Sequence, residues 1–238
     1  MPIKFKKCAV GYLDVLGFKD LVNSGNLTLI NEVAGLLQNA VPNFNNASIG
    51  RAPQKAIPTY TQISDCLIIS CQLAIKKNKK QYSGLASIVI RTIQIGQFFL
   101  RNKRAIRGGI DVDNVWHSQN NIVGPAFQTA YMLESSEAVF PRIILSNSAY
   151  KIWLKTNDES MPNTVINYRG HPTVNIFYVT YFPGLKHIGK GIEDELLFFK
   201  SFIESEANNQ KNRPEVREKW YWLLDFLEFS AQLQGFTL

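Results

Sequence analysis

The pattern of hydrophobic and polar positions predicts two strand-like segments that each carry one aspartate. Lys7–Leu16 is apolar on both faces except at Asp14, as in a buried strand. Thr59–Gln72 alternates with period two around Asp65, and predicts either one long strand or a hairpin whose turn falls near Ser64. Because a desolvated carboxylate is unfavourable without a partner, an aspartate in such a run needs one.

Helical spacing of apolar residues predicts most of the remaining elements. The strongest amphipathic pattern is Leu85–Leu100, which we assign to core packing. A second helix opens at Gly124 with Pro125 just inside its start and runs to about Ala138. The other predictions are a helix from Lys19–Val22 continuing over Leu27–Ala40, a loop over Asn43–Pro53, a turn over Lys76–Lys80, strands starting at Arg107 and over Arg142–Leu145 and Asn175–Tyr181, and two helices between Glu193 and Gln234 broken near Arg213 and Pro214.

Length and composition favour one globular domain. The chain has 238 residues, 45% hydrophobic and 19% charged, and no Pro/Gly/Ser-rich linker divides it. The first seven residues have no apolar signal core, and no stretch reaches the uncharged length of a membrane span, so we expect a cytoplasmic protein without membrane insertion. Cys8, Cys66 and Cys71 have no metal-type spacing, and we interpret them as reduced core residues.

The net charge of +7 indicates an anionic partner, although simple solubility is the alternative interpretation. A nucleic-acid partner is disfavoured because no recognisable binding motif is present and no aromatic residues lie among the basic ones. A nucleoside triphosphate is a smaller anion that accounts for both the basic charge and the two aspartates.

Two aspartates on neighbouring strands predict a site of hard oxygen ligands for divalent metal, the arrangement that two-metal phosphoryl transfer requires. Each also has a structural interpretation: Asp14 as the cap of the following helix, and Asp65 as a turn residue. Taken together with the later motifs, the pair favours metal binding.

Several motifs resemble one superfamily in their order and spacing. Tyr12–Phe18 resembles the first metal motif of the class III nucleotidyl cyclases, and Ser64-Asp65 stands where that superfamily has Gly-Asp. Arg107–Gly109 and Gly124–Glu134 look like its later strand and its dimer-face helix. The detailed form is similar to the pyrimidine cyclases of the Pycsar antiphage system, as seen in Gly124-Pro125-Ala126, Ala130-Tyr131 with Leu133-Glu134, and Phe140-Pro141-Arg142-Ile143. The resemblance spans roughly Tyr12 to Tyr181.

This resemblance implies an α+β fold, a ferredoxin-like palm (βααβ-βαβ) with C-terminal helices. Residues 1–185 would form the nucleotide cyclase catalytic domain, and residues 186–238 a helical extension packed on the same domain. The implied reaction converts UTP to 3′,5′-cyclic UMP and pyrophosphate, as a second messenger in antiviral (abortive infection) defence. Alternatives are a cytidylate cyclase making cyclic CMP from CTP, and a degenerate nucleotide-binding sensor.

The resemblance also implies a set of site residues. Asp14, Asp65 and the Val15 carbonyl would hold two Mg²⁺ or Mn²⁺ ions, with the two aspartates as the catalytic residues. The transition-state cation would come from Arg107 or Arg142. The implied nucleotide-binding residues are Leu16, Gly17, Phe18, Tyr60, Thr61 and Gln128.

The chain departs from the wider class III pattern at the residues that select the base and stabilise charge. Thr61 stands at the position of the lysine that selects a purine base, which argues against ATP and GTP. The later helix has Gln128 and Met132 in place of Asn and Arg, and Met132 cannot stabilise charge, which keeps the sensor alternative open. The resemblance further implies a homodimer with active sites at the subunit interface and a separate effector that senses the cyclic nucleotide.

Overall fold

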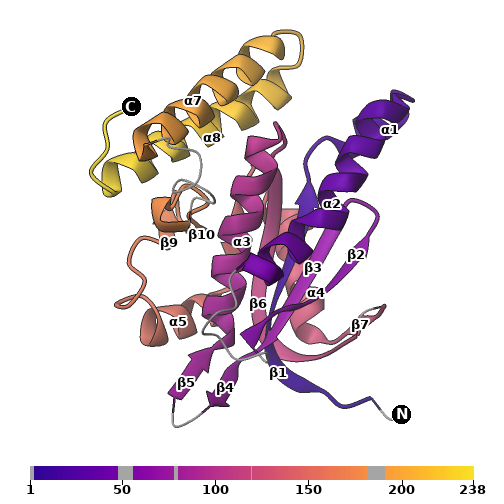
Figure 1. Ribbon diagram of the computed structural model, residues 1–238, viewed down its shortest axis with the longest axis vertical. Helices are drawn as coiled ribbons and strands as arrows, with labels where there is room; N and C mark the ends of the chain where they lie inside the picture. The colour runs from indigo at the N-terminus through magenta and orange to yellow at the C-terminus, as the bar shows by residue number, and fades with distance from the viewer. Residues whose placement is uncertain (1–2, 48–55, 78–79, 119, 182–190) are drawn as a thin grey trace.

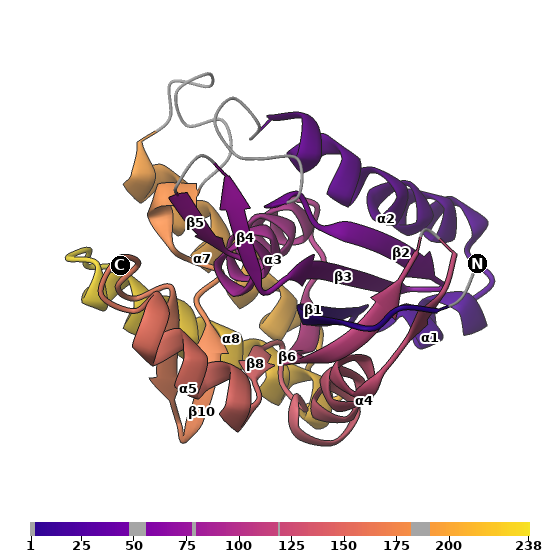
Figure 2. The same cartoon turned by 90° about the horizontal axis from the view of Figure 1, so that it is seen from below.

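The computed structural model describes residues 3–47, 56–77, 80–118, 120–181 and 191–238. In it a mixed sheet is covered by helices on both faces (Figures 1 and 2). The sheet order is β2-β3-β1-β6-β8-β10-β9, with β7 paired to β6. Its strands are β1 (Lys6–Val15), β2 (Thr59–Ile63), β3 (Cys66–Gln72), β6 (Ile106–His117), β7 (Ile122–Val123), β8 (Ile143–Leu145), β9 (Val165–Tyr168) and β10 (His171–Val174), and a separate hairpin is formed by β4 (Ala74–Lys77) and β5 (Lys80–Ser83).

Helices cover both faces of the sheet, α2 and α3 on one and α4 on the other (Figure 2). The predicted α+β class with its βααβ-βαβ core is confirmed. The helical segments are α1 (Phe18–Asn23), α2 (Leu27–Ala47), α3 (Gly84–Arg101), α4 (Pro125–Met132), the π-helical turn η2 (Leu133–Glu137), α5 (Asn147–Thr156), the 3-10 turn η3 (Val179–Tyr181), α7 (Ile192–Asn209) and α8 (Pro214–Leu233).

The central strand β1 lies between β3 and β6, antiparallel to both. Its apolar residues alternate between two cores because successive side chains point to opposite faces. Leu13 and Val15 join the main core under α3, whereas Val10 joins a smaller cluster under α4. This register places Asp14 opposite Cys66 on β3 and opposite Arg107 on β6.

Two of the predicted helices have the expected positions. The pattern Leu85–Leu100 becomes α3, whose N-cap Ser83 accepts a hydrogen bond from the Ala86 amide. The helix predicted from Gly124 to about Ala138 forms, but its last turn is π-helical, with the Ala138 amide bonded to the Leu133 carbonyl at 2.8 Å. The hydroxyls of Ser135 and Ser136 both donate to the Met132 carbonyl, which disturbs the regular ladder there.

The strand predicted over Asn175–Tyr181 is wrong. That segment is rich in β-branched and aromatic residues, but Asn175 is buried and turns the chain instead. Its side-chain oxygen accepts from the Phe177 amide and from Ser230 on α8, and its side-chain amide donates to the Asn163 carbonyl. The strands of this region are β9 and β10, which the pattern did not predict.

Two further predictions, the end of a helix and the loop after it, need correction. The helix predicted to end at Ala40 continues as α2 to Ala47, so the first part of the predicted loop Asn43–Pro53 is helical and residues 48–55 lie outside the described residues. Polar residues such as asparagine are only mildly unfavourable in helices, so their presence does not end one. The turn predicted over Lys76–Lys80 agrees with the β4–β5 hairpin, in which Lys77 pairs with Lys80, and residues 78–79 lie outside the described part. Helix α5 was not predicted; its N-cap Ser146 donates to the buried Asp111 of β6.

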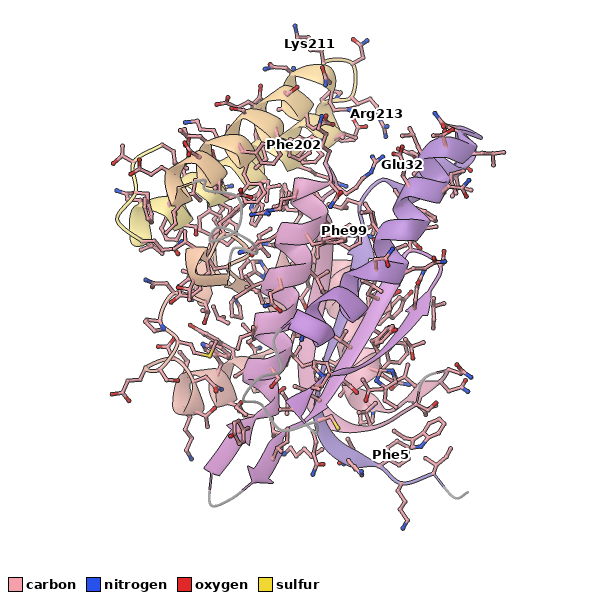
Figure 3. All side chains as sticks on the ribbon, viewed as in Figure 1. Phe5, Glu32, Phe99, Phe202, Lys211 and Arg213 are labelled. Carbon is pink, nitrogen blue, oxygen red and sulfur yellow. The ribbon has the colours of Figure 1, made fainter. Side chains whose placement is uncertain are left out.

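The C-terminal helices α7 and α8 form as predicted, broken near Arg213, and they pack on the sheet through aromatic side chains. Trp222 stacks on Phe140 at 5.6 Å between ring centroids, and Phe226 lies 5.0 Å from Tyr168 of β9. Figure 3 shows Phe202 of α7 near the end of α3. Because these rings belong to the same core cluster as the sheet residues, both helices share the main hydrophobic core.

Within the described ranges, the helices are too short or too polar for any of them to cross a membrane.

Candidate active site

The end of β1 and the β2–β3 turn bring Asp14 and Asp65 together. The hairpin turn predicted near Ser64 and Asp65 is present: Ile63 pairs with Cys66, and Ser64 has a positive φ of 54°. The Asp65 carbonyl accepts from the Val15 amide at 3.3 Å, which holds the turn against β1. As a result, one ligand atom each from Asp14, Asp65 and Cys66 lies within 4.8 Å of the others.

The two carboxylates repel one another, and the pKa of Asp14 reflects this. Burial raises that pKa most, the neighbouring Asp65 raises it further, and the Arg107 guanidinium lowers it without cancelling the other two. A cation between the carboxylates would relieve both the desolvation and the repulsion. Carboxylate oxygens are also the donors that Mg²⁺ and Mn²⁺ prefer, so these residues fit such ions.

Arg107 joins the aspartate pair to a third carboxylate. Its Nε lies 3.1 Å from Asp14 Oδ2, and its Nη2 lies 2.7 Å from Glu134 Oε1. Glu134 is buried on η2, and burial raises its pKa to about 7, with Asp14 adding to the rise while Arg107 opposes it. Arg107 therefore offsets negative charge at this end of the sheet.

A tyrosine and a thiol complete the wall beside Asp14. The Tyr12 hydroxyl donates to Cys66 Sγ at 2.9 Å, and that Sγ lies 3.6 Å from Asp14 Oδ1. The Tyr12 ring packs on Phe127 and Tyr131 of α4. The thiol is a softer ligand than the carboxylates, so we assign it to packing beside the site.

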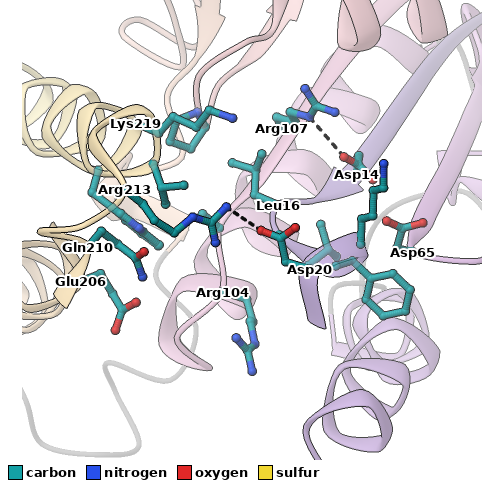
Figure 4. Close-up of a pocket in the computed structure, with 18 residues that line it drawn as sticks. Asp14, Leu16, Asp20, Asp65, Arg104, Arg107, Glu206, Gln210, Arg213 and Lys219 are labelled. Atoms are coloured by element: carbon teal, nitrogen blue, oxygen red, sulfur yellow. Dashed lines mark hydrogen bonds and ion pairs between the residues drawn. The ribbon is translucent and has the colours of Figure 1, made fainter. Parts of the chain in front are cut away.

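The aspartates open into a cavity of about 560 Å³ between α1 and the C-terminal helices (Figure 4). Its walls come from the end of β1, the turn into α1, the segment before β6, and helices α7 and α8. The residues that line it are Asp14, Val15, Leu16, Gly17, Phe18, Lys19, Asp20, Asp65, Arg104, Ala105, Arg107, Pro141, Glu206, Gln210, Arg213, Val216, Lys219 and Trp220.

Three of the implied nucleotide-binding residues lie in this cavity. Leu16, Gly17 and Phe18 all line it, next to Asp14. Gly17 has a φ of 80°, a left-handed conformation that residues with a side chain rarely adopt, and a Cβ added there would meet no atom within 4 Å. The glycine is therefore required by the turn rather than by crowding within the chain.

Four predicted residues lie elsewhere. Tyr60 packs against the main core, and the buried Thr61 donates to the Ser118 carbonyl and contacts His117 Nε2 at 2.9 Å. Gln128 is exposed on α4, on the other face of the sheet from α3. Arg142 is buried, with Nη2 donating to the Glu137 carbonyl at 2.6 Å. None of the four lines the cavity, whereas Arg107 does.

The sequence pattern missed the contribution of the C-terminal helices. Arg213 at the start of α8 reaches Asp20 of α1 at 2.7 Å, and Lys219 points into the same space (Figure 4). Glu206 of α7 and Gln210, the C-cap of that helix, complete this wall. The only available signal was the overall basic charge, because nothing in the local pattern of the tail indicates which of its cations faces the aspartates.

No known family model matches the chain, and no curated protein matches it. Among solved structures, it is similar to the catalytic core of a rhodopsin-guanylyl cyclase with converted specificity in complex with ATPαS, with 15% identity and a TM-score of 0.49 over 73% of this chain and 95% of that one. It is also similar to the monomeric guanylyl cyclase domain of the RhoGC fusion protein from the aquatic fungus Blastocladiella emersonii, with 17% identity and a TM-score of 0.48 over 65% of this chain and 90% of that one.

A bacterial light-regulated adenylyl cyclase is a third similar structure, with 13% identity and a TM-score of 0.45 over 63% of this chain. The aligned part spans only 46% of that chain, less than half of its length. At these identities and TM-scores, the likeness carries no conclusion about the activity of this protein.

Proposed function

We propose that the protein is a nucleotide cyclase that converts UTP to 3′,5′-cyclic UMP and pyrophosphate. The observation that carries this proposal is the pair of carboxylates, Asp14 and Asp65, at the edge of a cavity whose walls are rich in cations. In this reaction the 3′-hydroxyl oxygen bonds to the α-phosphorus and loses its proton, while the bond from the α-phosphorus to the bridging oxygen breaks and pyrophosphate leaves.

In this proposal, the residues of the site bind metal ions and stabilise charge. Asp14 and Asp65 hold the divalent ions, with the Val15 carbonyl as a further oxygen. Two such ions, when bound, lower the pKa of the attacking hydroxyl and neutralise charge on the triphosphate. Arg107 orients Asp14 through its 3.1 Å contact, and its guanidinium would stabilise charge on the α-phosphate, because a cation preplaced beside developing charge lowers the barrier.

Between the two arginines proposed for the transition state, the geometry favours Arg107. It lines the cavity beside Asp14, whereas Arg142 is buried and its guanidinium lies over the Phe140 and Trp222 rings at 5.7 and 5.9 Å from their centroids. Arg142 is better explained as a structural cation that ties η2 to α8.

The choice of a pyrimidine base follows from the resemblance. In the resemblance, Thr61 in place of a purine-selecting lysine favours a pyrimidine. In this chain the Thr61 side chain is buried outside the cavity and donates to the Ser118 carbonyl, so the preference comes from the resemblance alone. Cyclic CMP made from CTP is the second candidate, since uracil and cytosine differ at one hydrogen-bonding group. The role in antiviral signalling through a separate cyclic-nucleotide-sensing effector is part of the same proposal and rests on the resemblance alone.

We also propose that the protein is a homodimer. Gln128, an implied nucleotide-binding residue, does not line the cavity of its own chain, so in this proposal it serves the cavity of a second copy. Gln128, Tyr131 and Met132 share one face of α4, since positions three and four apart lie together on a helix, and all three are exposed. A second copy seated on this face would bring its Gln128 to the nucleotide. We also propose that the protein works in the cytoplasm.

The alternative is a nucleotide-binding sensor without turnover. Met132 is 56% exposed on α4 and supplies no cation where the related cyclases have arginine. This alternative predicts metal-dependent binding of a triphosphate with no cyclic product.

The test is to incubate the purified protein separately with ATP, GTP, CTP and UTP in the presence of Mn²⁺, and to identify the products by mass spectrometry. We expect cyclic UMP from UTP. Asp65→Asn should lower its rate of formation by about a hundredfold or more, because removing a metal ligand costs at least as much as removing its outer-shell partner. Asp158→Asn is the matched control, since Asp158 does not line the cavity.

Circular dichroism would show that both variants keep the wild-type fold. Turnover by Asp65→Asn at the wild-type rate would refute the metal assignment. Triphosphate binding without any cyclic product would favour the sensor.

A further inference from the structure

The wall of the cavity opposite the aspartates is built by the C-terminal helices of the same chain. Lys219 and Trp220 line it from α8, and Gln210 lines it from the C-cap of α7. The Trp220 ring lies edge-on to Phe202 of α7, with 5.5 Å between ring centroids, which fixes this part of α8. At the other end of α7, Glu195 pairs with Arg101 of α3 at 2.6 Å, and so holds the helix pair against the catalytic sheet.

The charges on the cavity walls are not all internally paired. Arg107 and Arg213 are each within 4.0 Å of carboxylates. Among the described residues, Lys19, Arg104 and Lys219 have no carboxylate at that distance. Three cations that line one cavity without a carboxylate partner favour a multiply charged anion.

The N-terminus of α1, which borders the cavity, contributes little positive potential from its backbone. Helix α1 has only six residues, and Gly17 provides no side-chain cap. A helix dipole grows from aligned peptide units, so this short helix contributes little to binding an anion. Side-chain cations must therefore supply most of the attraction.

We propose that α8 supplies Lys219 as a binding residue for the β- and γ-phosphates of the substrate, in the same chain that holds Asp14 and Asp65. Lys19 and Arg104 add charge from the opposite walls. Arg104 also lines a second cavity beside α2, so Lys219 is the more specific probe of this subsite. The inference rests on the proposed function for its ligand, a nucleoside triphosphate.

Arg213 has a different part in this arrangement. Its ion pair with Asp20 joins α8 to α1 across the cavity (Figure 4). While that pair is closed, the guanidinium charge is offset and is not free for phosphate. Removing the Asp20 charge should release Arg213 to the anion.

The test measures binding of inorganic tripolyphosphate to the full chain by calorimetry, with Mg²⁺ present. We expect Lys219→Gln to weaken binding about tenfold, the effect of losing one charge-assisted contact. Lys155→Gln removes the same charge from an exposed position on α5, a helix that contributes no residue to the cavity, and should leave affinity unchanged. Equal weakening in both variants would show non-specific attraction to a basic protein and would overturn the inference.

Asp20→Asn gives a test of opposite sign. It should tighten tripolyphosphate binding, whereas unchanged or weaker binding would mean that the anion does not lie beside Arg213. If no cyclic nucleotide forms but Lys219→Gln still weakens tripolyphosphate binding, the proposed function fails and this subsite stands. If cyclic product forms and Lys219→Gln matches the wild type in both tripolyphosphate affinity and KM, the subsite alone fails.

Discussion

Asp14 owes its position to a single register. It faces the α4 side of β1 because the strand alternates, and the antiparallel pairing sets Arg107 directly across from it on β6. A shift of one residue would move its carboxylate into the main core under α3. The same alternation places Tyr12 against α4, so the aromatic contacts of Tyr12 help to fix the register that the aspartate needs.

His117 offers a pH-dependent test at the scale of one residue. Its Nδ1 lies 2.7 Å from the Ser70 hydroxyl and its Nε2 lies 2.9 Å from Thr61 Oγ1, and burial lowers its pKa from 6.5 to about 4. The neutral ring is therefore favoured in the folded state, and the unfolded chain binds more protons between pH 4 and 6.5. The contribution of the neutral His117 ring to the free energy of unfolding is present above pH 6.5 and is lost as the pH falls from 6.5 to 4.

We therefore expect the free energy of unfolding to fall less steeply between pH 7 and pH 5 in His117→Gln than in the wild type. The difference should be about 2 kcal/mol at most, allowing for the partial exposure of the ring. Urea unfolding at both pH values, compared between the two proteins, isolates the histidine from the carboxylates that titrate nearby. The same pH dependence in both proteins would contradict the assignment.

Close packing of α4 and η2 against β6 positions the carboxylate of Glu134. Gly109 makes this approach possible, because a Cβ there would clash with the Ala130 carbonyl and would lie 2.6 Å from Leu133 Cβ. The neighbouring Gly108 meets β1 in the same way. The Gly-Gly pair on β6 thus serves packing on both of its neighbours, and Glu134 reaches Arg107 as a result.

Gly109→Ala should lower the free energy of unfolding by about 1–3 kcal/mol through overpacking. Gly35→Ala on α2 is the matched control, since a Cβ there meets nothing within 4 Å, and it should raise stability by about 0.5–1 kcal/mol. Urea unfolding of the two variants gives both values. Equal stability in the two would mean that α4 can move away from β6 without loss.

The cavity exists only at the scale of the whole molecule. Segments about 200 residues apart in sequence meet in it, since Asp20 of α1 contacts Arg213 of α8. The aromatic residues of α7 and α8 share the main core with the sheet. We therefore expect residues 186–238 to unfold together with residues 1–185 rather than as an independent unit.

Assembly is the other property of the whole molecule. We expect the wild-type chain to sediment as a dimer and Met132→Glu to sediment as a monomer that forms no cyclic product, because a charge on the exposed face of α4 would oppose a second copy. Leu154→Glu on α5 is the control, because Leu154 is 49% exposed but lies on a different helix, and it should remain dimeric and active. A dimeric, active Met132→Glu would place the interface elsewhere.

The amino-acid sequence by itself determined the strand that carries Asp14, the strands on either side of the turn at Asp65, and α3, because a period-two pattern and a helical apolar stripe are local properties of the chain. It also indicated the α+β class and the break between α7 and α8. The prediction was wrong where burial rather than periodicity decides the structure. At Asn175, hydrogen bonds with Phe177, Ser230 and Asn163 replace the predicted strand with a turn.

Only the tertiary structure decided which cations face the aspartates. Arg107 and Arg142 are equivalent candidates in the sequence, but cross-strand register places one beside Asp14 and core packing buries the other. Lys219 and Arg213 enter the site because the aromatic face of α8 docks on β9 and α7, which no local pattern encodes. Contacts between distant segments arise from the packing of complementary surfaces, and those surfaces exist only once the chain has folded.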